Sequence, residues 1–313
     1  MTARVARVTA HAKVNLILRV LAREASGFHT LETLFARLAL GDLVTVRITD
    51  ADRSVNCDVA VPGAPEHNLA YRAAQAFADS TGWPGGFAIE IEKRIPIGGG
   101  LGGGSADAGA VLRALSALSP EPVREAQLLE IAATLGSDVP YLTTAAPLAL
   151  AWSRGERMLA LPPLPEREVA LILPAFTVST AAAYSWLAAS RAGGNAPPAG
   201  DVRAEERTGA HPASRRSSPA SPQLLSLADL ATWRSVASLA TNDFEPVVSA
   251  RHPDIATSLS SLRAAGATIT LMSGSGSTVF GVFVAHPDAL PIPAGARVLH
   301  TRTLTSVSPV EIG

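Results

Sequence analysis

Hydrophobic and polar residues alternate near the start of the chain. From Val8 to Val20 every second residue is hydrophobic, and polar side chains, Lys13 and Asn15 among them, occupy most of the positions between. A period of two predicts a β-strand whose successive side chains point to opposite faces. We therefore expect one polar face on this strand, with Lys13 and Asn15 side by side on it.

The same reading predicts strands and helices through the rest of the chain. Alternating or continuous hydrophobic runs predict strands at 43–48, 55–61, 87–92, 148–152, 158–161, 169–173, 268–272 and 278–284. Hydrophobic residues spaced three and four apart predict helices at 68–78, 128–135, 227–239 and 254–265, and one that contains Val111, Leu115 and Leu118. Elements of both kinds, mixed along the chain, indicate an α+β fold.

Length and element order predict two domains. A chain of 313 residues is typical of about two domains, and we place them at 1–162 and 163–313, the second opening with the strand at 169–173. Between 191 and 222 the residues are mostly Gly, Pro, Ser, Ala and Arg, which can bury little surface. We expect this stretch to be a flexible insertion.

Composition narrows the class of protein. The formal net charge of -1 argues against a nucleic-acid partner, which usually selects a strongly basic domain. No hydrophobic run is long enough to span a bilayer, so we expect no membrane partner. The single Cys57 excludes a disulfide framework and fits a reducing cytoplasm. Lysine is rare, because only Lys13 and Lys93 occur.

Six of the seven residues from Gly98 to Gly104 are glycine. Glycine reaches positive φ and lets the backbone lie directly against a ligand. This segment leads from a predicted strand into a helix N-terminus, whose N–H groups and dipole favour phosphate. Ser105 and Asp107 suit the first helical turn, as cap and dipole partner. A tight turn would need only one or two glycines, so we expect a phosphate-binding loop.

Two familiar glycine motifs fit this segment less well. Gly98-x-Gly100-x-x-Gly103 has the spacing of the dinucleotide fingerprint, but the chain beyond it holds prolines and a helix where a second strand should end in an acid. The P-loop motif requires a lysine directly before Ser105, and Gly104 occupies that position. A dinucleotide oxidoreductase is therefore a weaker interpretation.

Lys13 and Asp138 are candidates for chemistry beside the loop. Phosphoryl transfer to an alcohol needs a cation for the developing charge and a group that receives or orients the hydroxyl proton. A lysine in mid-strand is unusual unless it is paired or exposed, and Asp138 follows a predicted helix. Each has a plainer alternative, because Lys13 could lie on an exposed strand face and Asp138 could cap the next element.

Residues 96–106 resemble the second motif of the GHMP kinases, a family named for galacto-, homoserine, mevalonate and phosphomevalonate kinases. The segments 12–16 and 136–140 are similar to those that supply a Lys, an Asn and an Asp at the reacting hydroxyl in this family. The resemblance implies an ATP-binding N-terminal domain and a ferredoxin-like C-terminal domain. It also implies Lys13 and Asp138 as the catalytic residues.

The resemblance assigns ATP to the glycine segment and to one helix start. The ATP-binding residues it implies are Pro96, Gly98, Gly99, Gly100, Leu101, Gly102, Gly103, Gly104, Ser105, Ala106 and Asn68. Capping is the plainer role for Asn68. ATP is expected as its Mg²⁺ complex, with Ser105 as the protein contact, because the sequence shows no dedicated metal cluster. The segment 273–277 resembles a third motif that approaches the phosphates, although a hairpin turn explains it equally well.

The glycine-rich form of residues 102–105 is similar to the branch that phosphorylates 4-diphosphocytidyl-2-C-methyl-D-erythritol in the non-mevalonate isoprenoid pathway. The substrate-binding residues it implies are Asn15, Phe28, His29, Phe35, Thr180, Tyr184 and Gly274. Rings on both sides of a cytosine would stack on it, while ordinary packing is the plainer role for each. Phe28 departs from the tyrosine expected there, so one hydroxyl is absent.

Two other functions stay open at this point. The same chemistry could act on another small alcohol, such as homoserine or mevalonate, although these lack a base to stack. A non-catalytic ligand sensor on the same fold would tolerate loss of Lys13 or Asp138. The expected partners are ATP and a cytidine-diphospho polyol, and the oligomeric state is expected to be a monomer or a homodimer.

Overall fold

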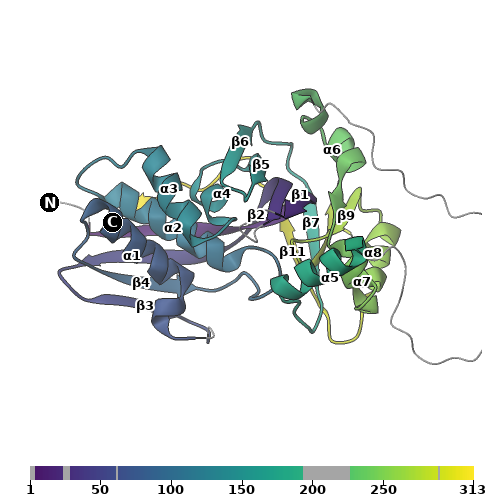
Figure 1. Cartoon of the computed structure of the whole chain (residues 1–313), viewed down its shortest axis with the longest axis horizontal. Coiled ribbons are helices and arrows are strands. Elements are labelled where there is room, and N and C mark those ends of the chain that lie inside the picture. The colour runs from purple at the N-terminus through teal and green to yellow at the C-terminus, as the bar shows by residue number, and fades with distance from the viewer. Residues whose placement is uncertain (1–3, 24–28, 61–62, 193–225, 288–289) are drawn as a thin grey trace, which may run out of the picture.

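The computed structural model describes residues 4–23, 29–60, 63–192, 226–287 and 290–313. Two sheets, each with its own helices, lie at opposite ends of an elongated molecule (Figure 1). Phe28 and nearly all of the expected insertion at 191–222 lie outside the described residues. Arg191 is described, and it belongs to the last turn of a helix that ends at Ala192.

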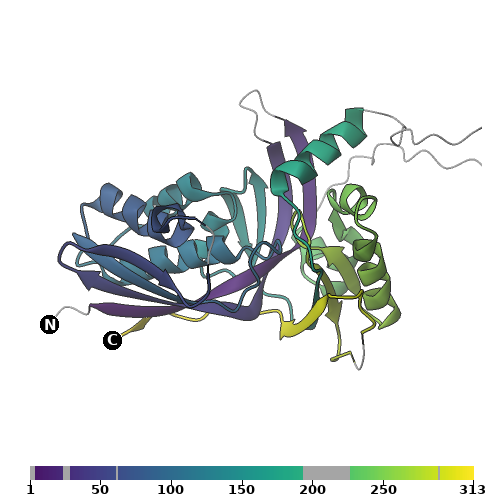
Figure 2. The same cartoon turned by 90° about the horizontal axis from the view of Figure 1, so that it is seen from below.

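The larger sheet has the order β12-β1-β2-β4-β3, with β5, β6 and β8 attached beside it. Its strands are β1 (Val5–Arg23), β2 (His29–Thr49), β3 (Arg53–Cys57), β4 (Gly86–Glu92), β5 (Leu148–Ser153), β6 (Arg157–Leu161), β8 (Thr241–Asn242) and β12 (Glu311–Ile312). Helices η1 (Pro65–His67), α1 (Leu69–Thr81), α2 (Gly103–Leu118), α3 (Glu125–Leu135) and α4 (Val139–Thr143) accompany it. Figure 2 shows them along one face of the sheet.

The smaller sheet is antiparallel, with the order β11-β7-β10-β9. Its strands are β7 (Glu168–Leu173), β9 (Ile269–Met272), β10 (Val279–Phe283) and β11 (Arg297–Arg302). The helices of this half are α5 (Thr180–Ala192), η2 (Leu227–Leu230), α6 (Trp233–Leu239), α7 (Glu245–Ser249) and α8 (Pro253–Ala264). The mixture of sheets and helices confirms the α+β class expected from the sequence.

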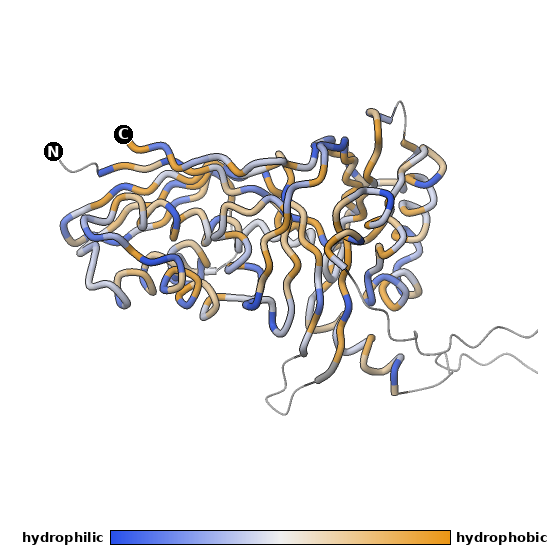
Figure 3. Tube along the Cα trace, turned by 90° about the horizontal axis from the view of Figure 1, so that it is seen from above, coloured by the Kyte–Doolittle hydropathy of each residue, from blue (hydrophilic) through white to orange (hydrophobic). Residues whose placement is uncertain are grey.

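Two hydrophobic cores support the molecule, and β1 contributes to both. The first part of β1 belongs to the larger core, which contains residues of α1, α2, the large sheet and one face of the smaller sheet, including Leu171 and Phe280. Leu18 and Val20 belong to the second core, with Ala183 and Leu187 of α5 and the other face of the smaller sheet. Figure 3 shows hydrophobic residues running through both halves of the chain trace. The division at 162/163 stays a prediction. The structure adds that β8 and β12, which come late in the chain, pair with β1 in the larger sheet.

Lys13 and Asn15 lie side by side on β1 as expected, with their side chains bonded at 2.8 Å. The face they share is buried, since both residues are 3% exposed and the N–H of Lys13 donates to Leu101 in the glycine loop, which contains residues 98–104. Four other local expectations were wrong. Ser105 does not cap α2, because Gly102 occupies the N-cap with φ 74°, and Asp107 lies in the second turn of α2, not in the first.

The predicted strand at 55–61 ends at residue 57. The predicted helix at 227–239 is divided into η2 and α6, where Thr232 caps α6 by accepting from the N–H of Ser235. A side-chain oxygen at an N-cap gives a helix a defined start, so Thr232 marks where the second piece begins. Within the described part of the chain, no helix is both long and hydrophobic enough to cross a membrane.

Candidate active site

The glycine loop runs from the end of β4 to the first turn of α2. Gly98, Gly100 and Gly102 all have positive φ, between 74° and 78°. A Cβ atom at Gly100 would collide with the carbonyl oxygen of Ser273, so only glycine fits there. The first N–H groups of α2 have no partner within the helix. The loop therefore brings amide donors and a helix N-terminus to one place.

Residues 273–277 join β9 to β10 and also touch the glycine loop. The hydroxyl of Ser273 donates to the carbonyl of Gly100 at 2.9 Å, and the N–H of Thr278 donates to Gly99 at 3.2 Å. The segment is thus a hairpin connection that also contacts the glycine loop, and its approach to phosphates stays a prediction. This contact joins the two halves of the molecule at the loop.

Lys13 and Asp138, 125 positions apart in the sequence, meet at this place. Lys13 Nζ lies 3.2 Å from Asp138 Oδ2, with side chains 4% and 28% exposed. Asp138 occupies the N-cap position of α4 but makes no side-chain capping bond. Its carboxylate contacts Lys13 instead of capping the helix. The structure therefore shows neither of the plainer roles, since Lys13 is buried and the Asp138 side chain caps no helix.

Asn15 fixes the position of Lys13. Its Oδ1 accepts from Lys13 Nζ at 2.8 Å and from the N–H of Gly274 at 3.1 Å, and its Nδ2 donates to Thr33 at 2.8 Å. A Cβ atom at Gly274 would lie 3.5 Å from Lys13 Nζ. Asn15 and Gly274, two of the residues expected to bind substrate, thus lie directly against the ammonium.

A cavity of about 260 Å³ opens beside this pair. It is lined by Lys13, Asn15, Leu18, Leu31, Thr33, Phe35, Gly100, Gly102, Ser137, Asp138, Gly155, Thr180, Tyr184, Phe244, Gly274 and Ser275. The glycine loop and the acceptor residues expected from the sequence share this wall. The cavity thus joins the glycine loop, the ion pair and the residues expected to bind the acceptor.

Thr180 and Tyr184 lie one turn apart at the start of α5. The hydroxyl of Thr180 is 3.0 Å from that of Ser275, and the Tyr184 ring packs edge-on against Phe244 with centroids 4.8 Å apart. Burial, followed by the charge of Asp138, raises the pKa of the Tyr184 hydroxyl. The rings of Tyr184 and Phe244 both give the cavity hydrophobic surface on which a flat base can stack.

Phe35 is 1% exposed, and another ring already covers one face of its own ring. It stacks on Tyr141 with centroids 4.7 Å apart, and Lys13 Nζ lies 5.5 Å from the Phe35 centroid. The Arg37 guanidinium lies 4.8 Å from the Tyr141 centroid. Phe35 therefore lines the cavity mainly as a support for Lys13. His29 begins β2, and its side chain lies outside the described residues.

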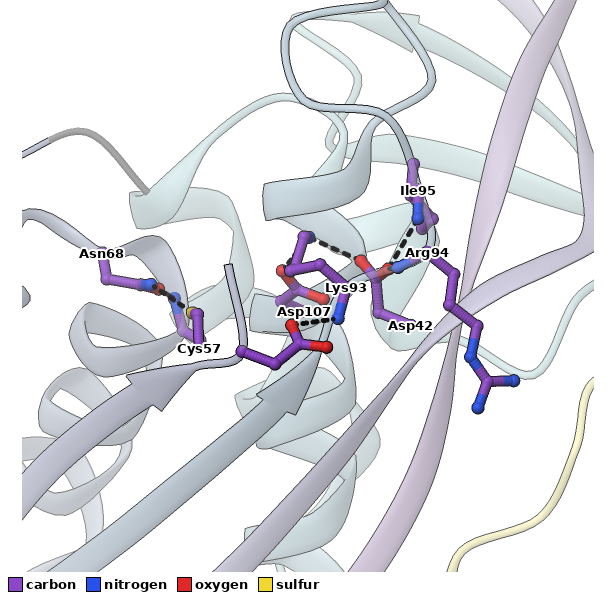
Figure 4. Close-up of polar contacts among 9 residues, drawn as sticks. Asp42, Cys57, Asn68, Lys93, Arg94, Ile95 and Asp107 are labelled. Carbon is purple, nitrogen blue, oxygen red and sulfur yellow. Dashed lines mark hydrogen bonds and ion pairs between the residues drawn. The ribbon is translucent and has the colours of Figure 1, made fainter. Parts of the chain in front are cut away.

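Asn68 lies at a second, separate cavity. It caps α1 by accepting from the N–H of Ala70 at 2.9 Å, and its Nδ2 points at Cys57 Sγ, 3.7 Å away (Figure 4). The cavity, of about 190 Å³, is lined by Val55, Cys57, Val59, Gly63, Ala64, Pro65 and Asn68. Asn68 thus performs the capping role and also faces this second cavity.

A metal site with its own ligand cage is absent from the described residues, where no three His, Cys, Asp or Glu side chains come together suitably. Ser105 is half-buried in the first turn of α2. A hydroxyl oxygen beside a phosphate site is a ligand that Mg²⁺ accepts, since this ion usually keeps waters and phosphate oxygens as its other ligands. The donor set therefore fits a metal that arrives with a nucleotide.

Several cavity residues were not expected from the sequence. Leu18, Leu31 and Phe244 give it hydrophobic walls, and Thr33 holds Asn15. Phe244 precedes α7 and is separated from Tyr184 by the segment of unusual composition, so only the fold brings the two rings together. In the sequence, Phe244 is visible only as an aromatic residue two positions before Pro246, and this pattern predicts no particular contact.

Comparisons with known proteins agree with this geometry. The chain matches the GHMP kinases N terminal domain over residues 68–145 and the GHMP kinases C terminal domain over residues 223–291. The 4-diphosphocytidyl-2-C-methyl-D-erythritol kinase of Anaeromyxobacter dehalogenans is 40% identical, covering 94% of this chain and 90% of that protein. The enzyme of the same name from Moorella thermoacetica is 38% identical, with coverages of 95% and 96%.

Solved structures show the same relationship. A crystal structure of 4-(cytidine 5′-diphospho)-2C-methyl-D-erythritol kinase superposes with a TM-score of 0.70 at 32% identity, covering 95% of this chain and 98% of that one. Homoserine kinase from Cytophaga hutchinsonii has a TM-score of 0.65 at 18% identity, with coverages of 100% and 98%, and so shows a shared fold alone. The chain therefore belongs to the GHMP kinase family.

Proposed function

We propose that this ATP-dependent small-molecule kinase transfers the γ-phosphoryl group of ATP to the 2-hydroxyl of 4-diphosphocytidyl-2-C-methyl-D-erythritol, a step of the non-mevalonate isoprenoid pathway. The contact of 3.2 Å between Lys13 and Asp138 at the wall of a cavity beside the glycine loop carries the proposal. The names of relatives at 38–40% identity over nearly the whole chain support the choice of acceptor.

The two charged residues have complementary roles in the transfer. Asp138, the more exposed partner, accepts or orients the proton of the acceptor hydroxyl as that oxygen attacks the γ-phosphorus. Lys13 stabilises the negative charge on the attacking oxygen and on the transferring phosphoryl group. Asn15 and Gly274 hold the ammonium in one place, so little reorganisation is needed when charge develops.

The nucleotide occupies the glycine loop in this proposal. Backbone N–H groups of residues 98–105, which include the first amides of α2, face the phosphates in this proposal, and positive φ at Gly100 and Gly102 shapes the loop for them. Mg²⁺ would be held by Ser105 together with phosphate oxygens, where it would neutralise phosphate charge. The cavity at Asn68 is the proposed place for the base of ATP.

The acceptor base is placed on the other side of the ion pair. Thr180, Tyr184 and Phe244 give that wall two hydroxyls and two rings. A cytosine can stack on such rings and accept or donate hydrogen bonds at its edge, whereas homoserine and mevalonate have nothing to stack. We expect the protein to work in the cytoplasm as a monomer or a homodimer, with no nucleic-acid or membrane partner.

One assay tests the proposal. Purified protein with ATP and Mg²⁺ is offered the cytidylated acceptor, homoserine, mevalonate and galactose in turn, and the formation of ADP is followed. Turnover with the cytidylated acceptor alone, inhibited competitively by cytidine diphosphate against that acceptor, is the expected result. Turnover of another alcohol at a comparable kcat/KM would show that the proposed acceptor is wrong. If ADP forms with none of the four alcohols, the proposed kinase function is wrong.

A further inference from the structure

Beneath the glycine loop, the second lysine of the chain lies between two carboxylates (Figure 4). Lys93 Nζ is 2.5 Å from Asp42 Oδ2 and 2.7 Å from Asp107 Oδ2. The side chains of Lys93, Asp42 and Asp107 are 7%, 0% and 6% exposed. The transfer proposed above uses none of these three residues, which we call the loop clamp.

Asp42 holds the start of the loop. It lies in β2, and its Oδ1 accepts from the backbone N–H groups of Arg94 and Ile95 at 2.5 and 2.7 Å. These two residues directly precede Pro96, where the loop begins. Since both oxygens of Asp42 are engaged, the backbone before the loop is fixed to the sheet.

Asp107 holds the end of the loop. It lies in the second turn of α2, and its Oδ2 accepts from Lys93. Its other oxygen, Oδ1, is buried and has no hydrogen-bond partner among the described residues. A half-satisfied buried carboxylate costs stability. Its presence under a phosphate site is therefore poorly explained by stability alone.

The loop rests directly on the clamp. A Cβ atom at Gly103, the first residue of α2, would lie 3.5 Å from Lys93 Nζ and 3.1 Å from Ile95 Cγ2. Lys93 thus connects the strand side of the loop with the helix side, directly under the N–H groups that begin α2. A change in these ion pairs would alter the separation of the two ends of the loop.

We propose that Lys93 and Asp107 are positioning residues for ATP, which tie the two ends of the glycine loop together so that its amides meet the phosphates already arranged. This inference rests on the proposed nucleotide site but not on the identity of the acceptor. Arranging donors before binding lowers the ordering cost of association and so increases affinity. The clamp itself touches no substrate.

Alanine at position 107 separates positioning from a structural role. Asp107→Ala removes a carboxylate that is only half satisfied and leaves Lys93 paired one-to-one with Asp42, so the urea midpoint stays or rises. The same change unties the helix end of the loop, so ATP binding weakens. Asp107→Asn keeps an oxygen that can accept from Lys93, so it restores most of the affinity. Loss of affinity without loss of stability is an outcome that a purely structural role would not produce.

The experiment measures binding and unfolding on the same full-length variants. The dissociation constant of a non-hydrolysable ATP analogue with Mg²⁺ is obtained by calorimetric titration, and stability by urea unfolding. We expect the dissociation constant to rise about tenfold in Asp107→Ala, which is the size of one hydrogen bond to a charged group. In Asp107→Asn it should rise less than about threefold. Lys93→Met weakens binding at least as much, if it folds. Leu115→Ala, in the buried far end of α2, is the matched control that loses stability but not affinity.

Three results would overturn the inference. An unchanged dissociation constant in Asp107→Ala would do so, and so would a midpoint lowered as much as that of Leu115→Ala. Equal weakening of binding in Leu115→Ala would show that general destabilisation is responsible. If the wild-type chain does not bind the analogue, both the proposed nucleotide site and the proposed role of the clamp are wrong. If it binds the analogue but phosphorylates none of the alcohols, only the proposed acceptor reaction fails.

Discussion

The chain contains two lysines, and both are buried and paired with carboxylates. Lys13 faces one carboxylate, Asp138, which is 28% exposed at a cavity wall. Lys93 faces two carboxylates that are almost wholly enclosed. An ammonium with one half-open partner retains attraction for an incoming anion, whereas an ammonium enclosed by two does not. The exposure of the partner carboxylate thus distinguishes Lys13, which is suited to chemistry, from Lys93, which is suited to positioning.

The largest effect is expected at the open pair. Asp138→Asn removes the group that receives or orients the hydroxyl proton, so kcat falls by at least about a hundredfold, the usual scale for a general base. Binding of the ATP analogue stays within about twofold, because the carboxylate is outside the glycine loop. Steady-state kinetics with calorimetry measures both.

Glu166→Gln is a matched control for that variant. Glu166 pairs with Arg302 at 3.3 Å on an exposed surface, with both side chains about half exposed, where such pairs contribute little. Turnover is expected to stay at the wild-type value. If Asp138→Asn retained wild-type turnover, the open pair would have no part in the chemistry.

A third buried cation, Arg37, sharpens the comparison because no carboxylate pairs with it in the described part of the chain. Its side chain donates to the carbonyls of Ala146, Tyr141 and Thr144 at 2.7–3.1 Å. It thereby holds the end of α4, the helix that begins after Asp138. Arg37→Met leaves these carbonyls without donors and should lower the free energy of unfolding by about 3 kcal/mol, measured by urea denaturation.

Arg302→Met, which breaks only an exposed pair, should cost less than about 1 kcal/mol. Equal losses in Arg37→Met and Arg302→Met would show that the carbonyl contacts of Arg37 contribute nothing special. The kcat of Arg37→Met at saturating substrates is measured as well. If the variant loses stability but keeps the wild-type kcat, the support that Arg37 gives to α4 does not affect catalysis.

The clamp predicts a pH dependence of stability. Burial, opposed by Lys93 and reinforced by Asp42, raises the pKa of Asp107 from 3.8 to about 7. Between these two pH values the folded chain binds more protons than the unfolded chain, so this carboxyl lowers stability progressively as pH rises from about 4 to 7. Asp107→Asn should therefore raise the free energy of unfolding by about 2 kcal/mol at pH 8 and by little at pH 4.

Urea unfolding of both proteins at several pH values checks this expectation. The difference between Asp107→Asn and wild type should grow as pH rises through 7 and then level off. A difference that is constant with pH, or one that grows toward acid pH, would contradict the assignment of the raised pKa to Asp107.

The smallest effect is expected on the acceptor side. Tyr184→Ala removes one ring from the cavity wall, and the loss of one stacking contact should raise KM for the cytidylated acceptor about tenfold. KM for ATP should not change, since we place the Tyr184 ring against the acceptor base and not against the nucleotide. Tyr184→Phe keeps the ring, and we expect its KM to stay within about threefold of wild type. A rise in KM for ATP instead would show that Tyr184 belongs to the nucleotide side.

Local patterns were sufficient for most elements. Alternation along β1, helical spacing in α1 and α3, and the glycine segment between β4 and α2 all identified their structures, with ends shifted by a few residues. Patterns failed where tertiary contacts decide. The polar face of β1 is buried because the glycine loop and Asp138 cover it, and the first part of β2 shows no clean period because residues on both its faces are buried.

Only some members of the site were predictable from the sequence, and their roles less so. Lys13, Asp138 and the glycines followed from residue type and family resemblance, and the structure brings them together. Asn68 proved to cap a helix, and Asn15 is bonded to Lys13, Gly274 and Thr33. The clamp could not be foreseen, since Asp42 lies in β2, Lys93 follows β4 and Asp107 lies in α2, and only strand pairing and helix packing bring their charges into contact.

The most direct test compares one variant from each lysine pair under the same conditions. The single-turnover rate is measured at saturating ATP and cytidylated acceptor in Lys13→Met and in Asp107→Ala. We predict that Lys13→Met falls at least about a hundredfold, because its ammonium stabilises the transferring phosphoryl group, while Asp107→Ala stays within about threefold of wild type. A fast Lys13→Met, or an Asp107→Ala equally slow at saturation, would contradict the division between the two lysines.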